Sequence, residues 1–170
     1  MKKVSFRNDI LPFKNVLYRL ALRITLNQQD AEDVVQDTLM KVWNRREEWD
    51  EIDNIEAFVL TIARNLALDK MKRADTFNAS IEEGNIAETH FMSNPYEQII
   101  RRDRIEKVRE LLDKLPEKQR SCMQLRDFEG KTYKEIAEIL GISEEQVKVN
   151  IFRARQAIKQ KYQEAEQYGL

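Results

Sequence analysis

The stretch that most restricts the fold of this chain is 132–161, which reads TYKEIAEILGISEEQVKVNIFRARQAIKQK. Thr132, with a glutamate three positions later, has the pattern of a helix N-terminal capping box. Gly141 can adopt the positive φ that ends such a helix. Ser143, with a glutamine three positions later, then begins a longer helix that we expect to run to about Tyr162. Two helices joined by a three-residue turn predict a helix-turn-helix.

The apolar residues of this stretch agree with that motif. At 100° per residue, the second helix carries one apolar stripe, which we expect to be buried. Its members are Val147, Ile151, Ala154 and Ile158. Ala137 allows the two helices to approach, and larger apolar side chains fill the space between them. These are Ile136, Leu140, Ile142, Val147 and Ile151.

The opposite face of the second helix combines cations, which suit phosphates, with side chains that suit the edges of bases. Apolar groups on this face could contact thymine methyls. The candidate DNA-reading residues are Val149, Phe152, Arg153 and Gln156, with Lys148 and Arg155 on the flanks of this face. The alternative is that the cations are merely solvated and that the apolar groups belong to another contact within the protein. The agreement of caps, glycine and packing favours DNA reading.

Composition extends the helical prediction to the whole chain. Of 170 residues, 35% are charged, and only 4 Gly and 3 Pro are present, which favours helices joined by short turns. An all-α fold is therefore predicted. One cysteine, Cys122, and one histidine, His90, exclude an internal disulfide and leave too few ligands for structural zinc. We expect no cofactor, and we expect Cys122 to be a buried thiol.

The sequence also predicts where the chain divides. Residues 76–95 contain no Lys or Arg and no sustained helical period, so they are predicted to be a flexible linker. Asn94 and Pro95 have the pattern of a new helix start. Two small helical domains, 1–75 and 96–170, follow. The chain has no long apolar run and no signal-peptide pattern at its start, so we expect it in the cytoplasm.

In the first domain, a helix from about Asp30 carries an apolar stripe of Val35, Leu39, Val42 and Trp43, which we expect to be a core face. The opposite face is polar apart from one methionine. Its residues are Asp33, Gln36, Asp37, Met40 and Asn44. A methionine among polar neighbours is typical of an adaptable protein contact, although acidic residues near a helix start are favoured by the helix dipole in any case.

The next helix, IEAFVLTIARNLALDKMKR, is apolar around most of its circumference, so we expect it to be buried on most sides. Thr61, Asn65, Asp69 and Lys72 form a narrow polar strip. This strip could contact a base or a phosphate. A solvated strip with a cationic end that suits the helix dipole fits the pattern equally well.

Three blocks of the sequence, in this order, resemble the extracytoplasmic-function (ECF) group of bacterial sigma factors. The blocks are YRLALRITLNQQDAEDVVQDTLMKVW, AFVLTIARNLALDKMKR and LPEKQRSCMQLRDFEGKTYKEIAEILGISEEQVKVNIFRARQAI. The resemblance implies a transcription initiation factor that binds core RNA polymerase and promoter DNA and catalyses no reaction itself. It also implies an anti-sigma factor as a partner, which in the family is often membrane-anchored.

The resemblance assigns a role to each candidate set. It implies that the polar face of the helix from about Asp30 docks on the clamp coiled coil of polymerase. The residues of that face are Asp33, Gln36, Asp37, Met40 and Asn44. It implies −10 element binding by Asn65, Asp69, Lys72 and Arg73, with the loop around 50–54. It implies −35 element binding by the last helix, through Lys148, Val149, Asn150, Phe152, Arg153 and Arg155. Gln146, Val149, Asn150 and Phe58 depart from residues common in the family, so we expect promoter preference to differ.

Two other functional classes remain as alternatives. An autonomous helix-turn-helix regulator would bind duplex DNA without polymerase, but no alternating βα pattern of a receiver domain is present. An enzyme would need catalytic groups, and the sequence offers no glycine-rich phosphate loop and no GxSxG motif.

Overall fold

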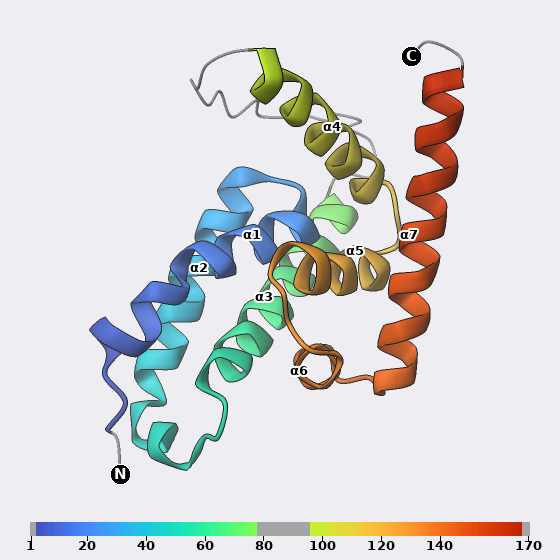
Figure 1. The fold of residues 1–170 in the computed structure, drawn as a ribbon. Helices are drawn as coiled ribbons and strands as arrows, with labels where there is room; N and C mark the ends of the chain where they lie inside the picture. The colour runs from blue at the N-terminus through green and yellow to red at the C-terminus, as the bar shows by residue number, and fades with distance from the viewer. Residues whose placement is uncertain (1–2, 78–95, 168–170) are drawn as a thin grey trace.

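The computed structural model describes residues 3–77 and 96–167, and these form helices with no strand among them (Figure 1). The α-helices are α1 (Lys14–Thr25), α2 (Gln28–Asn44), α3 (Ile55–Phe77), α4 (Tyr96–Asp113), α5 (Glu117–Met123), α6 (Tyr133–Leu140) and α7 (Glu144–Gln167). Short turns of 3-10 or π-helix are η1 (Phe6–Ile10), η2 (Leu11–Phe13), η3 (Arg46–Glu51) and η4 (Gln124–Phe128). The predicted all-α class is confirmed. Most of the predicted linker, with Asn94 and Pro95, lies outside the described residues.

The helix-turn-helix formed by α6 and α7 has the predicted caps. The hydroxyl of Thr132 accepts a hydrogen bond from the Glu135 N–H at 3.1 Å. Ser143 and Gln146 form a complete capping box, in which each side chain accepts from the other's backbone N–H at 3.1 Å. Gly141 ends α6 with φ +68. The motif is therefore fixed locally at each of its turns.

Some helix boundaries differ from those predicted. Asn27 caps α2 by accepting from the Asp30 N–H at 3.0 Å, so this helix starts before Asp30. The last helix, α7, continues past Tyr162 to Gln167.

The amino-terminal half is a three-helix unit in which α1, α2 and α3 all contact one another. Leu17, Leu20, Val34 and Leu60 lie in its core and are fully buried. In the carboxy-terminal half, α7 contacts α4, α5 and α6. A small cluster of its own joins α4, α5 and α7, comprising Leu112, Leu115, Met123, Ala154 and Ile158.

The two halves also pack against each other, as Figure 1 shows for α3 and α6. One continuous apolar cluster contains the core of α1–α3 together with side chains from the other half. The latter are Cys122, Leu125, Ile136, Ile139, Leu140, Val147 and Ile151. The arrangement of the halves, which the sequence left open, is a closed one with a shared core.

Gly141 offers a test of the turn between α6 and α7. Gly141→Ala should lower the free energy of unfolding by about 1–2 kcal/mol, since an L-residue is strained in the left-handed conformation. An added Cβ would meet no atom within 4 Å, so backbone strain is the whole cost. Urea unfolding measures the loss. Gly141→Asn should lose less, because asparagine tolerates this conformation better. An equal loss for both variants would contradict the explanation.

Candidate nucleic-acid faces and docking groove

The predicted reading face of α7 is exposed to solvent. Val149 and Phe152 are 45% and 63% exposed, unusual values for apolar side chains, while Asn150 is half-buried. The stripe of Val147, Ile151, Ala154 and Ile158 is buried, as predicted. Exposed apolar groups between exposed cations are what base contact requires.

The polar members of this face differ in how far they are already engaged. Arg155 forms a two-contact ion pair with Asp127, in which its Nε donates to Oδ2 at 3.0 Å. This hydrogen bond raises the pKa of the Arg155 guanidinium. The Lys148 ammonium lies 5.5 Å from the centre of the Tyr133 ring. Arg153 has no hydrogen-bond or ion-pair partner within residues 3–77 and 96–167. Of the three cations Lys148, Arg153 and Arg155, it is therefore the most available to contact a phosphate.

Asn150 is also engaged, because its side-chain amide donates to the backbone oxygen of Gln146 at 2.8 Å. That bond lies within α7 itself. The side chain is therefore held along the helix and keeps its oxygen as the group most open to a ligand.

The predicted strip on α3 is exposed at Asn65, Asp69, Lys72 and Arg73. Thr61 is half-buried and its hydroxyl donates to the Ala57 oxygen at 2.7 Å, so it is less available. The preceding loop leads directly to this helix. Its Asn54 side chain accepts from the Ala57 N–H at 3.0 Å and thereby caps α3.

The predicted protein-contact set on α2 is exposed throughout, and comprises Asp33, Gln36, Asp37, Met40 and Asn44. Met40 is 65% exposed. Asp33 lies 3.5 Å from the Lys70 ammonium, which links this face to α3. Asp37 makes no ion pair with any residue described here. The acidic end of the face therefore keeps one uncompensated carboxylate.

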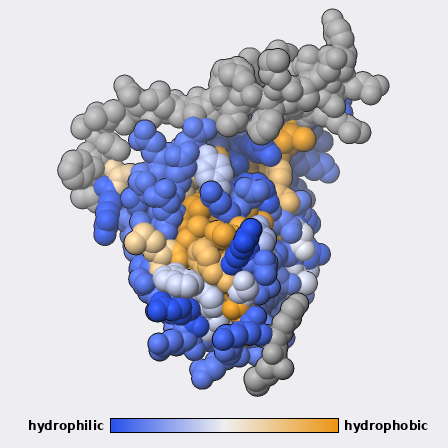
Figure 2. Space-filling view, turned by 90° about the vertical axis from the view of Figure 1, so that its left-hand side faces the viewer, coloured by the Kyte–Doolittle hydropathy of each residue, from blue (hydrophilic) through white to orange (hydrophobic). Residues whose placement is uncertain are grey.

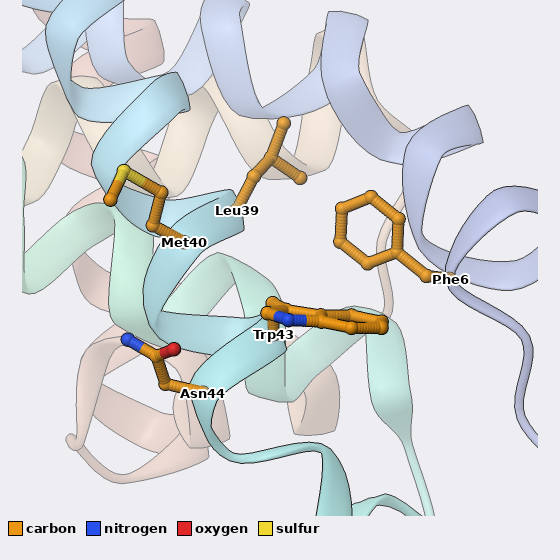
Figure 3. Close-up of a pocket in the computed structure, with 5 residues that line it drawn as sticks. All are labelled: Phe6, Leu39, Met40, Trp43 and Asn44. Carbon is orange, nitrogen blue, oxygen red and sulfur yellow. The ribbon is translucent and has the colours of Figure 1, made fainter.

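A groove of about 430 Å³ opens next to this set, lined by Phe6, Leu39, Met40, Trp43 and Asn44. Figure 3 shows Phe6, from the chain before α1, beside Trp43 of α2. The two rings meet edge to face with centroids 5.6 Å apart. Figure 2 views the molecule from the side of α1 and α2, and shows hydrophobic residues gathered amid hydrophilic ones.

The prediction that Trp43 lies in the core is wrong, since this side chain is 47% exposed. Trp49, in η3, is buried instead and donates from its indole N–H to the Val42 oxygen at 3.0 Å. Trp43 is left at the edge of the core, where Arg46 stacks on it at 4.7 Å. Helical periodicity could not reveal this, because Trp49 and Phe6 lie outside α2. The sequence pattern therefore identified neither Phe6 nor Trp43 as a residue that lines this groove.

Cys122 is buried, and burial raises the pKa of its thiol to about 12. No group of three or more His, Cys, Asp or Glu side chains in the described part of the chain could hold a metal ion. None of the described helices is long and apolar enough to cross a membrane.

Two family models match the chain, Sigma-70 region 2 over residues 10–77 and Sigma-70 region 4 over residues 105–158. The chain is 33% identical over 150 residues to the ECF RNA polymerase sigma factor SigL of Mycobacterium tuberculosis, covering 88% of this chain and 84% of the relative. It is 28% identical over 153 residues to the ECF RNA polymerase sigma factor SigM of Bacillus subtilis, covering 88% and 90%.

Two solved structures have a similar fold. The sigma factor RpoE from Bartonella quintana, in complex with the anti-sigma factor NepR, matches with a TM-score of 0.74 at 24% identity, covering 91% of this chain and 94% of that one. CnrH, in complex with the cytosolic domain of CnrY, matches with a TM-score of 0.65 at 21% identity, covering 91% and 84%.

The Arg155–Asp127 pair generates a test of the α7 face. Asp127→Asn should raise the affinity for duplex DNA roughly two- to tenfold and steepen the salt dependence by about one counterion, because a freed guanidinium can neutralise a phosphate. Fluorescence anisotropy at several salt concentrations measures both quantities.

The matched control is Glu138→Gln, which removes one exposed carboxylate of α6 without releasing an arginine. An equal gain in both variants would show that net charge alone is responsible.

Proposed function

The chain belongs to the ECF sigma factors of the sigma-70 family, and on that premise we propose that it binds core RNA polymerase and directs it to promoters. In this proposal the domain 1–75 docks on polymerase and opens the −10 element. The domain 96–170 reads the −35 element, and residues 76–95 link the two. The observation that supports the proposal is that the residue sets implied by the resemblance on α2, α3 and α7 are exposed, apart from the half-buried Asn150.

The α2 face and its groove are the proposed polymerase contact. Met40 lines the groove and is an adaptable apolar group, and the contacting rings of Phe6 and Trp43 form one aromatic wall against which an apolar side chain of the partner can pack. Asp33 and Asp37 lie toward the start of α2, so a partner helix with cations at that end would be complementary in charge. The apolar groove supplies affinity, and the acidic residues supply orientation.

The α3 strip is the proposed −10 contact. Asn65 offers an amide for the edge of a base, and Lys72 and Arg73 offer cations for the backbone. Asp69 lies between Asn65 and Lys72 along α3, and its carboxylate would accept a hydrogen bond from the exocyclic amine of a base. Opening of the duplex is feasible here because a captured base compensates for the few kcal/mol of lost stacking.

The face of α7 is the proposed −35 reader, with unequal contributions from its six residues. Val149, Phe152 and Arg153 are free to meet bases and phosphates. Lys148, Asn150 and Arg155 each have a partner within the chain and would adjust on binding. Promoter preference therefore depends most on Val149, Phe152 and Arg153.

The chain acts as an initiation factor in the cytoplasm, where polymerase and promoter DNA are found, and has no catalytic activity of its own. An anti-sigma factor is the proposed inhibitor, since both structural neighbours were solved with partners, one of them named as an anti-sigma factor. Co-purification under non-inducing conditions tests for such a partner.

The proposed function is tested by transcription in vitro with core polymerase of the source organism and a promoter library. Transcripts should start at shared upstream elements, and only when both chain and core enzyme are present. Footprinting by the chain alone, without polymerase dependence, would instead identify an autonomous regulator.

The groove generates a separate prediction. Met40→Glu should weaken binding to core polymerase by at least about tenfold, because a carboxylate would be desolvated in an apolar contact. Met40 is 65% exposed, so the melting temperature should stay unchanged. Binding is measured by titrating a fluorescently labelled chain with core enzyme.

Gln29→Glu is the control, since it adds the same charge to α2 at an exposed position outside the groove. Undiminished binding by Met40→Glu would exclude the groove from the polymerase contact.

A further inference from the structure

We propose that Arg45, supported by Phe58, is a platform on which one unpaired base of the opened −10 element stacks. Neither residue belongs to the sets assigned above to polymerase or to DNA. The inference rests on the proposed function, because an unpaired base is present only where the chain takes part in opening a promoter.

The platform joins the end of α2 to the start of α3. The guanidinium of Arg45 lies over the ring of Phe58, with its central carbon 4.8 Å from the ring centre. Phe58 is half-buried and packs against the apolar core, whereas the side chain of Arg45 is 49% exposed. The guanidinium therefore covers the ring and presents its remaining surface to solvent.

A second contact fixes the orientation of Arg45. Its Nε donates to Oε2 of Glu48 at 2.6 Å, and this hydrogen bond lowers the pKa of the Glu48 carboxyl. The guanidinium is thus held along one edge by Glu48 and over the ring by Phe58. A side chain that is already held in this way loses less conformational freedom when a ligand binds to it.

Phe58 lies in line with the proposed −10 strip of α3. At 100° per residue, Phe58, Asn65 and Asp69 fall within about 40° of one another around the helix. Phe58 precedes Asn65 by seven residues, or about 10 Å along the axis. About three stacked nucleotides span that distance, at about 3.4 Å each. A strand that contacts Asn65 can therefore place a nearby base on Arg45.

The chemistry of the platform fits a base better than another ligand. A guanidinium is planar and weakly hydrated, and it stacks on aromatic faces and on unpaired bases. The Phe58 ring has no polar atom, so it supports Arg45 by its face alone. Every base has a π-face, so stacking tolerates any sequence. The platform would therefore stabilise the opened strand, while the choice of base is left to polar groups such as Asn65.

The neighbouring Arg46 makes a similar contact in a different place. Its guanidinium lies over the ring of Trp43 at 4.7 Å and donates to the Trp43 backbone oxygen at 3.2 Å. Trp43, however, lines the groove beside α2 and does not belong to the α3 strip. Arg46 is therefore a control that matches Arg45 in residue type, exposure and aromatic contact.

The first experiment separates stacking from charge. The chain bound to core polymerase is titrated with single-stranded oligonucleotides that carry each strand of the −10 element of a promoter it uses. Arg45→Lys keeps the charge but loses the planar group, so it should weaken binding of one strand about fivefold or more, with unchanged salt dependence. Arg46→Lys should bind that strand as the wild type does. Fluorescence anisotropy at several salt concentrations measures both quantities.

A contact between Arg45 and a phosphate gives a different result. Arg45→Lys would then bind like the wild type, and Arg45→Ala would reduce the salt slope by about 0.7. That outcome would overturn stacking, as would equal losses for Arg45→Lys and Arg46→Lys.

The second experiment identifies the base. Oligonucleotides that lack one base at a time are bound by the wild type and by Arg45→Lys. At one position, loss of the base should weaken binding by the wild type about fivefold and leave binding by Arg45→Lys unchanged, because the same stacking contact is already lost. Equal effects on both chains at every position would contradict the proposal.

The third experiment changes the support of the platform. Phe58→Leu removes the ring under Arg45 and should reproduce the loss seen for Arg45→Lys, whereas Phe58→Trp keeps an aromatic face and should bind as the wild type does. Because Phe58 also packs against the core, the melting temperature and the affinity for core polymerase are measured for both variants. Full oligonucleotide affinity in Phe58→Leu would exclude the ring from the platform. A wild-type chain that neither binds core polymerase nor initiates transcription would instead refute the proposed function.

Discussion

The packing of α3 against α6 determines where the exposed strip of α3 lies relative to the exposed face of α7. α1 and α2 cover part of α3, and α6 covers another part, so that α3 retains only a narrow strip of exposed polar residues. The same contact fixes the start of α7, because Gly141 and the Ser143 cap allow little freedom between α6 and α7. The proposed −10 and −35 faces are therefore positioned relative to each other by a single interface.

The modest charge of the chain agrees with this organisation. A net charge of −1 overall gives little nonspecific attraction to DNA, and Asp127 already engages Arg155. A sigma factor does not need high affinity of its own, because polymerase binding makes the DNA contact a tethered event at high effective concentration. In the proposed function, selectivity then depends on a few exposed groups such as Phe152 and Arg153.

The local parts of the structure were readable from the sequence. Capping at Thr132 and Ser143 and the left-handed Gly141 depend on residues within one turn of each other, so pattern alone predicts them. The failures concern residues whose environment comes from elsewhere in the chain. Trp43 was assigned to the core because its own helix has an apolar stripe there, whereas Trp49 occupies that place and Phe6 makes Trp43 one wall of a groove.

The sequence by itself determined the helices, the helix-turn-helix, the exposed faces of α2, α3 and α7, and the family. It could do so because helical period and capping are short-range properties. Only the tertiary structure decided that the halves close on one another, and that Arg120 and Arg64 are buried there. The partners of these arginines are mainly backbone oxygens and carboxylates far along the chain, and such acceptors leave no periodic signal in the sequence.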